Sequence, residues 1–415
     1  MESTMEVKQE RAVLVGLNAD CFTKEQTATE ESIEELEALL ETAGGFCTGK
    51  ILQNRHAPDP HSFIGEGKAL EVKMLVEETE STMVVFDNEL SAGNIRALED
   101  ITGVTVLDRS ALILDIFAQR AKTKEGRLQV ELAQYKYLLP RLSGMGTSLS
   151  RQGGGIGTRG PGETKLESDR RHIRERIARL EQELEQVRQV RGVQRERRMK
   201  NSVPVVAIVG YTNAGKSTLL NQLTDAGIPA NNRLFDTLDT TSRQLSVSDT
   251  LDVVLTDTVG FIAKLPHHLV KAFHATLEEL LHVIDSADEN RDEHIAVVDR
   301  LISQLAKPGT PVLRCYNKAD LASKEDIPFG EDVVAISAAT GIGMDRLLQA
   351  IETALGHSRY HVVATLPYSM GGMVETLHKN ARVLSVDYTG EGIVVETVVD
   401  AILYGRLREY ITKEC

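Results

Sequence analysis

The stretch Val203–Leu223 reads VPVVAIVGYTNAGKSTLLNQL. It opens with a β-branched apolar run typical of a buried strand, continues with GxxxxGKS from Gly210 to Ser217, and ends in an amphipathic helical pattern. A strand, a glycine-rich turn and a helix in this order form a phosphate-binding loop, whose backbone NH groups surround the β-phosphate. We expect Lys216 to reach the β and γ oxygens and the Ser217 hydroxyl to bind Mg²⁺. The predicted loop consists of Gly210, Tyr211, Thr212, Asn213, Ala214, Gly215, Lys216 and Ser217.

Two further apolar strands downstream end in motifs that complete a guanine nucleotide site. LDVVLTDTVG ends in the DxxG of Asp257 to Gly260, where the carboxylate faces the Mg²⁺ shell and Gly260 lets a backbone NH approach the γ-phosphate. PVLRCYNKAD ends in an NKxD, whose Asp320 can accept the N1 and N2 hydrogens of guanine. These motifs predict GTP as the nucleotide and Lys216 and Gly260 as catalytic residues. The remaining predicted site residues are Asp257, Thr258, Val259, Gly260, Asn317, Lys318, Asp320, Ser337, Ala338 and Ala339.

A polar, threonine-rich segment, LFDTLDTTSRQL (Leu234–Leu245), separates the phosphate loop from the DxxG. One of its threonines is expected to close over the γ-phosphate and complete the Mg²⁺ shell, which makes the segment a switch ordered by GTP and released by GDP. The spacing leaves Thr237, Thr240 and Thr241 as candidates.

The residue after the DxxG glycine is Phe261, at the place where many small GTPases have the glutamine that orients the attacking water. A phenyl ring cannot orient water, so we expect slow unassisted hydrolysis that needs a partner or an ion. Asn213 is a candidate K⁺ ligand beside the phosphates; the alternative is that Asn213 only shapes the loop.

The remaining sequence predicts an α/β protein with three further parts around the central one. Short β-branched runs alternate with helical patterns before residue 110, which predicts a parallel sheet. Two long helical patterns follow; the first is stopped by Pro140 and the second runs from about Leu166 to Lys200, which predicts an antiparallel hairpin. The predicted parts are an N-terminal parallel α/β domain (1–109), a two-helix hairpin (110–200), a doubly wound P-loop G domain (201–357) and a small C-terminal α+β domain (358–415).

The expected hairpin tip, GGGIGTRGPGETK (Gly153–Lys165), contains a GxGxxG. No strand feeds it and Pro161 interrupts it, so it is not a dinucleotide-binding turn. It is either a plain linker or, through Arg151, Arg159 and Lys165, an RNA contact. The arginines of the second helix likewise form either a solvated face or an RNA-binding face. They are Arg170, Arg171, Arg174, Arg176, Arg179, Arg188, Arg191, Arg195, Arg197 and Arg198.

Composition sets broad limits on the protein class. The 415 residues are 41% hydrophobic and 26% charged, as in globular proteins, and the net charge of −14 argues against a chain coated all over in nucleic acid. The four cysteines lie far apart and are expected to be reduced thiols. Neither a signal peptide nor an apolar run of membrane-spanning length is evident, so we expect a cytoplasmic monomer.

Several of these segments together resemble the HflX family of ribosome-associated GTPases. They are LDRSALILDIFAQRAKTKEGRLQVELAQYKYLLPRL, GGGIGTRGPGETKLESDRRHI, GYTNAGKSTL and DTVGFI. The resemblance implies a GTPase that binds the large ribosomal subunit, through rRNA and ribosomal protein, splits or rescues stalled ribosomes under stress, and is stimulated by ribosomal particles. It implies that the hairpin tip reaches toward the peptidyl-transferase centre and that ATP binds the N-terminal region. The family's FxTLD motif matches Phe235, Asp236, Thr237, Leu238 and Asp239, and points to Thr237 as the catalytic and Mg²⁺-binding threonine.

Two features depart from the family pattern. Thr240 stands where proline is common, which loosens the first switch. The helix AFHATLEEL runs straight into LLHVID and is about two turns shorter than expected. Either this helix ends early or the G domain is distorted beside its second switch, which predicts impaired GTP hydrolysis or ribosome coupling. Two alternative functions remain at this stage: an RNA chaperone or ATP-dependent RNA-remodelling protein regulated by its G domain, and a GTPase partner in tRNA modification.

Overall fold

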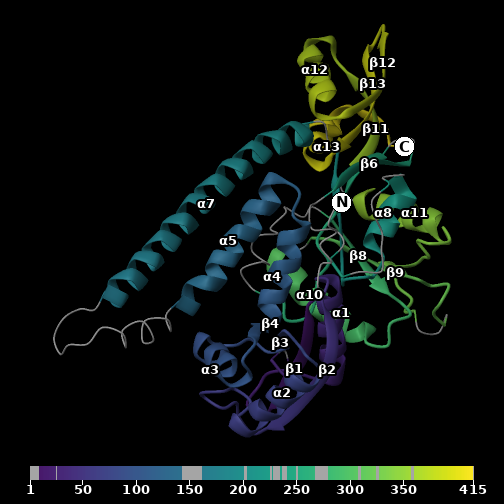
Figure 1. Cartoon of the computed structure of the whole chain (residues 1–415). Helices are drawn as coiled ribbons and strands as arrows, with labels where there is room; N and C mark the ends of the chain where they lie inside the picture. The colour runs from purple at the N-terminus through teal and green to yellow at the C-terminus, as the bar shows by residue number, and fades with distance from the viewer. Residues whose placement is uncertain are drawn as a thin grey trace, which may run out of the picture. The chain divides into compact units, whose positions relative to one another are not determined.

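The computed structural model describes residues 9–24, 26–142, 161–200, 203–224, 227, 234–235, 241–248, 251–266, 279–306, 310–323, 327–356 and 359–414 (Figure 1). The chain divides into two compact units. The first comprises residues 1–185, 232–239 and 262–273, and the second comprises residues 186–231, 240–261 and 274–415. The four-part division drawn from the sequence stays a prediction.

The first unit contains a four-stranded parallel sheet in the order β2-β1-β3-β4. Its strands are β1 (Arg11–Ala19), β2 (Phe46–Arg55), β3 (Met83–Phe86) and β4 (Thr105–Asp108). Its helices α1 (Glu30–Thr42), α2 (Glu66–Glu78) and α3 (Ala92–Thr102) alternate with the strands. Val13, Val15 and Leu17 of β1 lie in one buried cluster with Val84 and Val106. The predicted parallel sheet is therefore confirmed.

Three helices follow this sheet: α4 (Arg109–Arg120), α5 (Lys124–Arg141) and α7 (Pro161–Lys200). Ion pairs join α5 to α7, with Arg176 Nη2 2.6 Å from Glu131 Oε1 and Lys136 Nζ 2.7 Å from Glu181 Oε1. Pro140 lies inside α5, which ends one residue later. Within the described part of the chain, none of the helices combines the length and apolar character of a membrane span.

The start of α7 corrects the predicted extent of the hairpin tip. The helix begins at Pro161, so the last five residues of the glycine-rich stretch Gly153–Lys165 are helical. Proline is favoured at the first helical position because its missing NH would have no intrahelical partner there. Residues 143–160, including Arg151 and Arg159, lie outside the described residues.

The second unit contains a six-stranded sheet in the order β10-β9-β8-β5-β7-β6, in which only the edge strand β6 is antiparallel to its neighbour. Its strands are β5 (Val205–Gly210), β6 (Ser242–Ser248), β7 (Leu251–Asp257), β8 (Glu279–Asp285), β9 (Val312–Asn317) and β10 (Val333–Ala335). Its helices are α8 (Lys216–Thr224), α10 (Arg291–Leu305) and α11 (Met344–Gly356). The predicted doubly wound sheet is confirmed. The end of the threonine-rich segment, Ser242–Leu245, forms the first part of strand β6.

The same unit ends in a second, all-antiparallel sheet in the order β12-β13-β11-β14. Its elements are β11 (Arg359–Leu366), α12 (Gly371–Asn380), β12 (Arg382–Thr389), β13 (Gly392–Asp400), α13 (Ala401–Leu407) and β14 (Ile411–Glu414). This βαββαβ order is that of a ferredoxin-like domain. The predicted α+β character is confirmed, but the last element is a strand that the sequence pattern missed.

Candidate nucleotide site

Lys216 is the first residue of α8, directly after the loop that connects β5 to this helix. Its side chain is only 6% exposed, and Nζ donates to the carbonyl oxygens of Gly210 at 3.1 Å and Tyr211 at 2.6 Å. Burial lowers the pKa of Lys216 to about 8, and the nearby Asp257 carboxylate partly opposes this shift. The ammonium group is thus held at the loop where the phosphates are expected.

Asn317 links the phosphate loop to the two base-recognition loops, which are the NKxD turn (residues 317–320) and the turn of residues 337–339. This buried residue is the last of β9, and its Nδ2 donates to Ala214 O at 2.8 Å while its Oδ1 accepts from Ala338 N at 2.9 Å. The contact requires glycine at position 215, because a Cβ there would lie 2.2 Å from Asn317 Nδ2 and the backbone φ is +94°. The structure therefore brings together three motifs: Ala214 of the phosphate loop lies 103 residues from Asn317 in sequence, and Ala338 lies 21 residues from it.

The two charged residues of the NKxD turn differ in their surroundings: Asp320 is exposed, and Lys318 forms an ion pair. Asp320 is exposed at the end of the NKxD turn. Lys318 has a left-handed backbone (φ +59°), and its Nζ lies 2.6 Å from Asp285 Oδ2 at the end of β8. Ser337 is fully buried and Ala338 nearly so. The motif search missed Asp285, because nothing in the local sequence distinguishes it from other acidic residues at strand ends.

Ser217, at the start of α8, and Asp257 bring two side-chain oxygen atoms together next to the phosphate loop. Ser217 Oγ donates to Asp257 Oδ2 at 3.1 Å, and Asp257 is fully buried at the end of β7. A hydroxyl and a carboxylate at this separation are the hard oxygen donors that Mg²⁺ prefers. These residues fit the predicted metal position, whereas Thr237 lies outside the described residues.

The DxxG motif lies directly against the phosphate loop. Phe261 N donates to Gly210 O at 3.0 Å, and Thr212 N donates to Phe261 O at 2.8 Å. A Cβ at Gly260 would lie 2.9 Å from Thr212 Cγ2 and 3.2 Å from Lys216 Nζ, so only glycine fits without displacing the lysine. The Phe261 side chain is 5% exposed and packs into the interior.

The remaining predicted site residues are only partly described. Val259 is buried, and Thr258 Oγ1 donates to Ile208 O at 2.7 Å. Phe235 is 2% exposed, with its ring edge-on to Phe117 at 4.7 Å. Asp236 to Thr240 lie outside the described residues, as do residues 272–278 of the helix AFHATLEEL expected to be short. The last two residues predicted for that helix, Glu279 and Leu280, belong to strand β8.

Comparison with known proteins gives consistent matches along the chain. Residues 30–118 match a family described as GTP-binding GTPase N-terminal, residues 120–198 match its Middle Region, and residues 205–318 match 50S ribosome-binding GTPase. The chain is 48% identical over 410 residues to GTPase HflX of Caldanaerobacter subterraneus subsp. tengcongensis, covering 97% of this chain and 94% of that protein. It is 45% identical over 371 residues to GTPase HflX of Escherichia coli, covering 86% of each. It is 44% identical over 416 residues to GTPase HflX of Alkalihalophilus pseudofirmus, covering 98% of each.

Proposed function

The chain belongs to the HflX family of GTPases, and from this premise we propose that it couples GTP binding and hydrolysis to association with the large ribosomal subunit, where it dissociates or rescues stalled ribosomes under stress. The observation that carries the proposal is the joining of phosphate loop, DxxG and NKxD by the buried Asn317 and the Phe261 backbone. The match of residues 205–318 to a 50S ribosome-binding GTPase family supports the choice of partner.

In the proposed site, each residue has a distinct role toward the nucleotide. Asp320 accepts the guanine N1 and N2 hydrogens, and its exposure leaves it free to do so. Lys216 leaves the Tyr211 carbonyl and moves to the β and γ phosphates. Gly260 presents its NH to the γ-phosphate. Mg²⁺, held through Ser217 and Thr237, neutralises the charge of the phosphates when bound.

Slow hydrolysis by the isolated chain follows from the position of Phe261. The NH and the carbonyl of Phe261 are both hydrogen-bonded to the phosphate loop, and its ring is buried. The residue therefore has no polar group left to bind or orient the attacking water molecule. The group that orients the water is then supplied when the ribosomal particle binds. This accounts for a GTPase that is stimulated by its partner.

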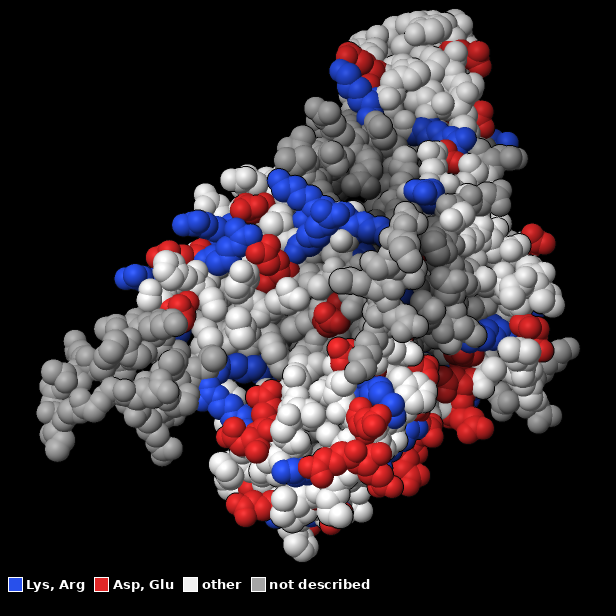
Figure 2. Space-filling view, in the orientation of Figure 1, with Lys and Arg blue, Asp and Glu red and all other residues white. Residues whose placement is uncertain are grey.

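The proposed RNA-contacting surface is the outer face of α7. Arg174 and Arg179 are exposed, whereas Arg176 is half-buried and pairs with Glu131 of α5. Figure 2 shows Lys and Arg gathered over the α5–α7 pair, with acidic side chains between them. Guanidinium groups on a helix face are well suited to the phosphates of rRNA.

Cosedimentation with purified large ribosomal subunits tests the proposal. We expect the chain to pellet with the subunits in the presence of a non-hydrolysable GTP analogue and to remain largely in the supernatant with GDP. A parallel series with a non-hydrolysable ATP analogue separates this function from an ATP-dependent RNA-remodelling activity. Pelleting that is independent of nucleotide, or that responds only to the ATP analogue, would contradict the proposal.

A further inference from the structure

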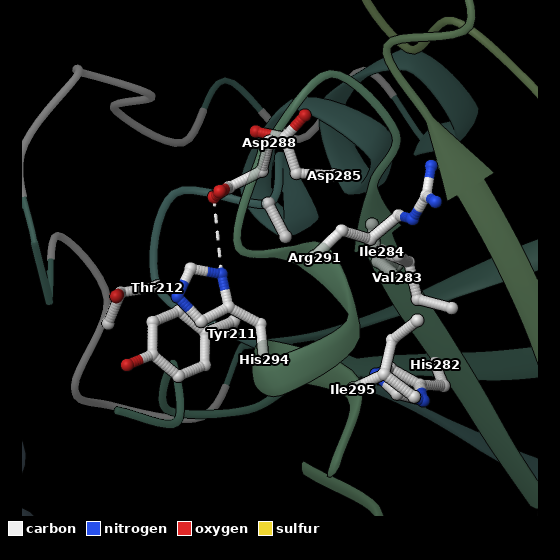
Figure 3. A pocket seen from close by; sticks show the side chains of 11 residues that line it. Tyr211, Thr212, His282, Val283, Ile284, Asp285, Asp288, Arg291, His294 and Ile295 are labelled. Carbon is white, nitrogen blue, oxygen red and sulfur yellow. Dashed lines mark ion pairs between the residues drawn. The ribbon is translucent and has the colours of Figure 1, made fainter. Parts of the chain in front are cut away.

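The second residue of the phosphate loop, Tyr211, stacks on a histidine of α10. The rings of Tyr211 and His294 are 3.7 Å apart at their centroids and inclined by 10°, and Tyr211 is 7% exposed. The pair lines a pocket beside the phosphate loop together with Asp285 at the end of β8 and Asp288 in the connection from β8 to α10 (Figure 3). A nearly parallel ring contact of this kind fixes the orientation of a side chain that would otherwise rotate.

Asp288 orients the His294 ring. His294 Nδ1 lies 3.1 Å from Asp288 Oδ2, the ion pair drawn in Figure 3. Asp288 is itself held in the first turn before α10, where its Oδ1 accepts from Asn290 N at 2.8 Å. The imidazole is therefore placed by its own backbone, by the carboxylate and by the tyrosine ring.

The helix that carries His294 is anchored to the sheet. Arg314 of β9 lies 2.9 Å from Asp299 of α10, and His282 of β8 lies 3.4 Å from the other oxygen of the same carboxylate. Val298 and Ile302 of α10 are buried. His294 thus projects from a helix that packs against the central sheet, which gives Tyr211 a firm support.

The position of Tyr211 matters for the nucleotide through its backbone. Its two neighbours join the phosphate loop to the DxxG motif, because Gly210 O accepts from Phe261 N and Thr212 N donates to Phe261 O. Tyr211 O itself accepts from Lys216 Nζ, the bond that the lysine exchanges for the phosphates in the proposed site. We propose that His294, oriented by Asp288, is a positioning residue of this GTPase that fixes the phosphate loop by stacking on Tyr211. The inference rests on the proposed nucleotide site. It adds a residue that lies in none of the sequence motifs of that site.

The contact is expected to act on nucleotide binding rather than on the chemical step. The ring contact joins two side chains of the protein and depends on no group of the nucleotide, so we expect it to support the GTP-bound and GDP-bound loops alike. Interactions made equally in the ground state and the transition state change KM and leave kcat unaltered. A loss of His294 should therefore raise KM and speed the release of GDP.

Dissociation of a fluorescent N-methylanthraniloyl GDP from the full chain tests the inference. We expect His294→Ala to speed dissociation and raise the KM for GTP by roughly 3- to 10-fold, with kcat within about twofold. His294→Phe retains a ring for stacking and should restore most of the loss. His361→Ala is the matched control. His361 of β11 is similarly half-buried, its Nε2 lies 3.0 Å from Glu396 Oε1 of β13, and both residues lie outside the nucleotide site. Melting temperatures establish that each variant is folded.

The outcomes separate the inference from the proposed nucleotide site. If the unsubstituted chain does not bind the labelled GDP, the site itself is wrong and the inference falls with it. If the unsubstituted chain binds and His294→Ala behaves like the control, only the inference is overturned. Equal losses for His294→Ala and His294→Phe would also overturn it, because a stacking role requires rescue by the phenyl ring.

Discussion

At the scale of single residues, Lys216 carries the most unusual electrostatics of the site. Its cation is buried against two carbonyl oxygens, and desolvation lowers its pKa to about 8. Phosphate oxygens favour the charged form, so the pKa must rise when nucleotide binds. Binding and protonation of Lys216 are therefore linked.

This linkage predicts weaker GDP binding above about pH 8. Below that pH Lys216 is already charged in the free protein, and the affinity should stay flat. Above it the free lysine is neutral and binding must take up a proton, so the affinity should fall by up to about tenfold per pH unit. Calorimetry at pH 8.5 in buffers of different ionisation enthalpy should detect this proton. In Lys216→Arg, whose cation does not titrate, proton uptake should disappear; uptake that is unchanged in this variant would exclude Lys216 as its source.

Two alternative roles are open for Asn213: it binds K⁺ beside the phosphates, or it only shapes the loop. Its backbone is left-handed (φ +61°), which asparagine tolerates well, and its side chain is exposed. Glycine preserves this backbone while removing the amide oxygen. A role in loop shape and a role as K⁺ ligand therefore respond differently to Asn213→Gly.

We expect Asn213→Gly to slow single-turnover GTP hydrolysis in K⁺ by roughly tenfold or more, with little effect on GDP affinity. Replacing K⁺ by Na⁺ should slow the unsubstituted chain by a comparable factor and leave the variant unaffected. Quenched-flow measurement of phosphate release checks both. A rate that is insensitive to the cation would leave Asn213 with the loop-shaping role alone.

At the scale of elements, local sequence patterns predicted what is locally determined. The β5–loop–α8 unit, the four-stranded parallel sheet and the parallel strands of the six-stranded sheet follow from apolar runs and glycine turns that lie within a few residues of one another. The short strand β14 (Ile411–Glu414) has no such pattern and exists because it pairs with β11, about fifty residues away. Asp285 and His294 were missed for the same reason, since their roles depend on partners that are distant in sequence.

The α7 helix gives a prediction about RNA contact at this scale. Arg174→Glu combined with Arg179→Glu should weaken binding to large ribosomal subunits and reduce the slope of log K against log salt by roughly 1.4 to 1.8. Arg346→Glu with Lys413→Glu makes the same change in net charge at exposed positions outside α7 and serves as the control. Binding at several salt concentrations is measured by cosedimentation. Equal losses in both variants would indicate a general charge effect, and unaltered binding would favour a solvated face.

At the scale of the whole molecule, the nucleotide site and the C-terminal sheet have separate cores. The buried cluster of the central sheet includes Val206, Leu255 and Val283, and that of the C-terminal sheet includes Val362, Leu377 and Val395. The strands of the C-terminal sheet hydrogen-bond only to one another among the described strands. All described residues of the proposed site lie between Gly210 and Ala339, before the C-terminal sheet begins at Arg359.

This separation predicts that removal of the C-terminal sheet and its helices leaves nucleotide binding intact. A chain ending at Gly356 should bind GDP with an affinity within about twofold of the full chain, because no site residue and no strand of the central sheet is removed. Titration with labelled GDP measures the affinity, and far-ultraviolet circular dichroism verifies that the shortened chain is folded. A tenfold weaker affinity in a folded chain would show that the C-terminal sheet supports the base-recognition loops through α11, which precedes it directly. Unchanged affinity would show that the C-terminal sheet is not needed for nucleotide binding, and comparison of the truncated and full chains would then measure its contribution to ribosome binding.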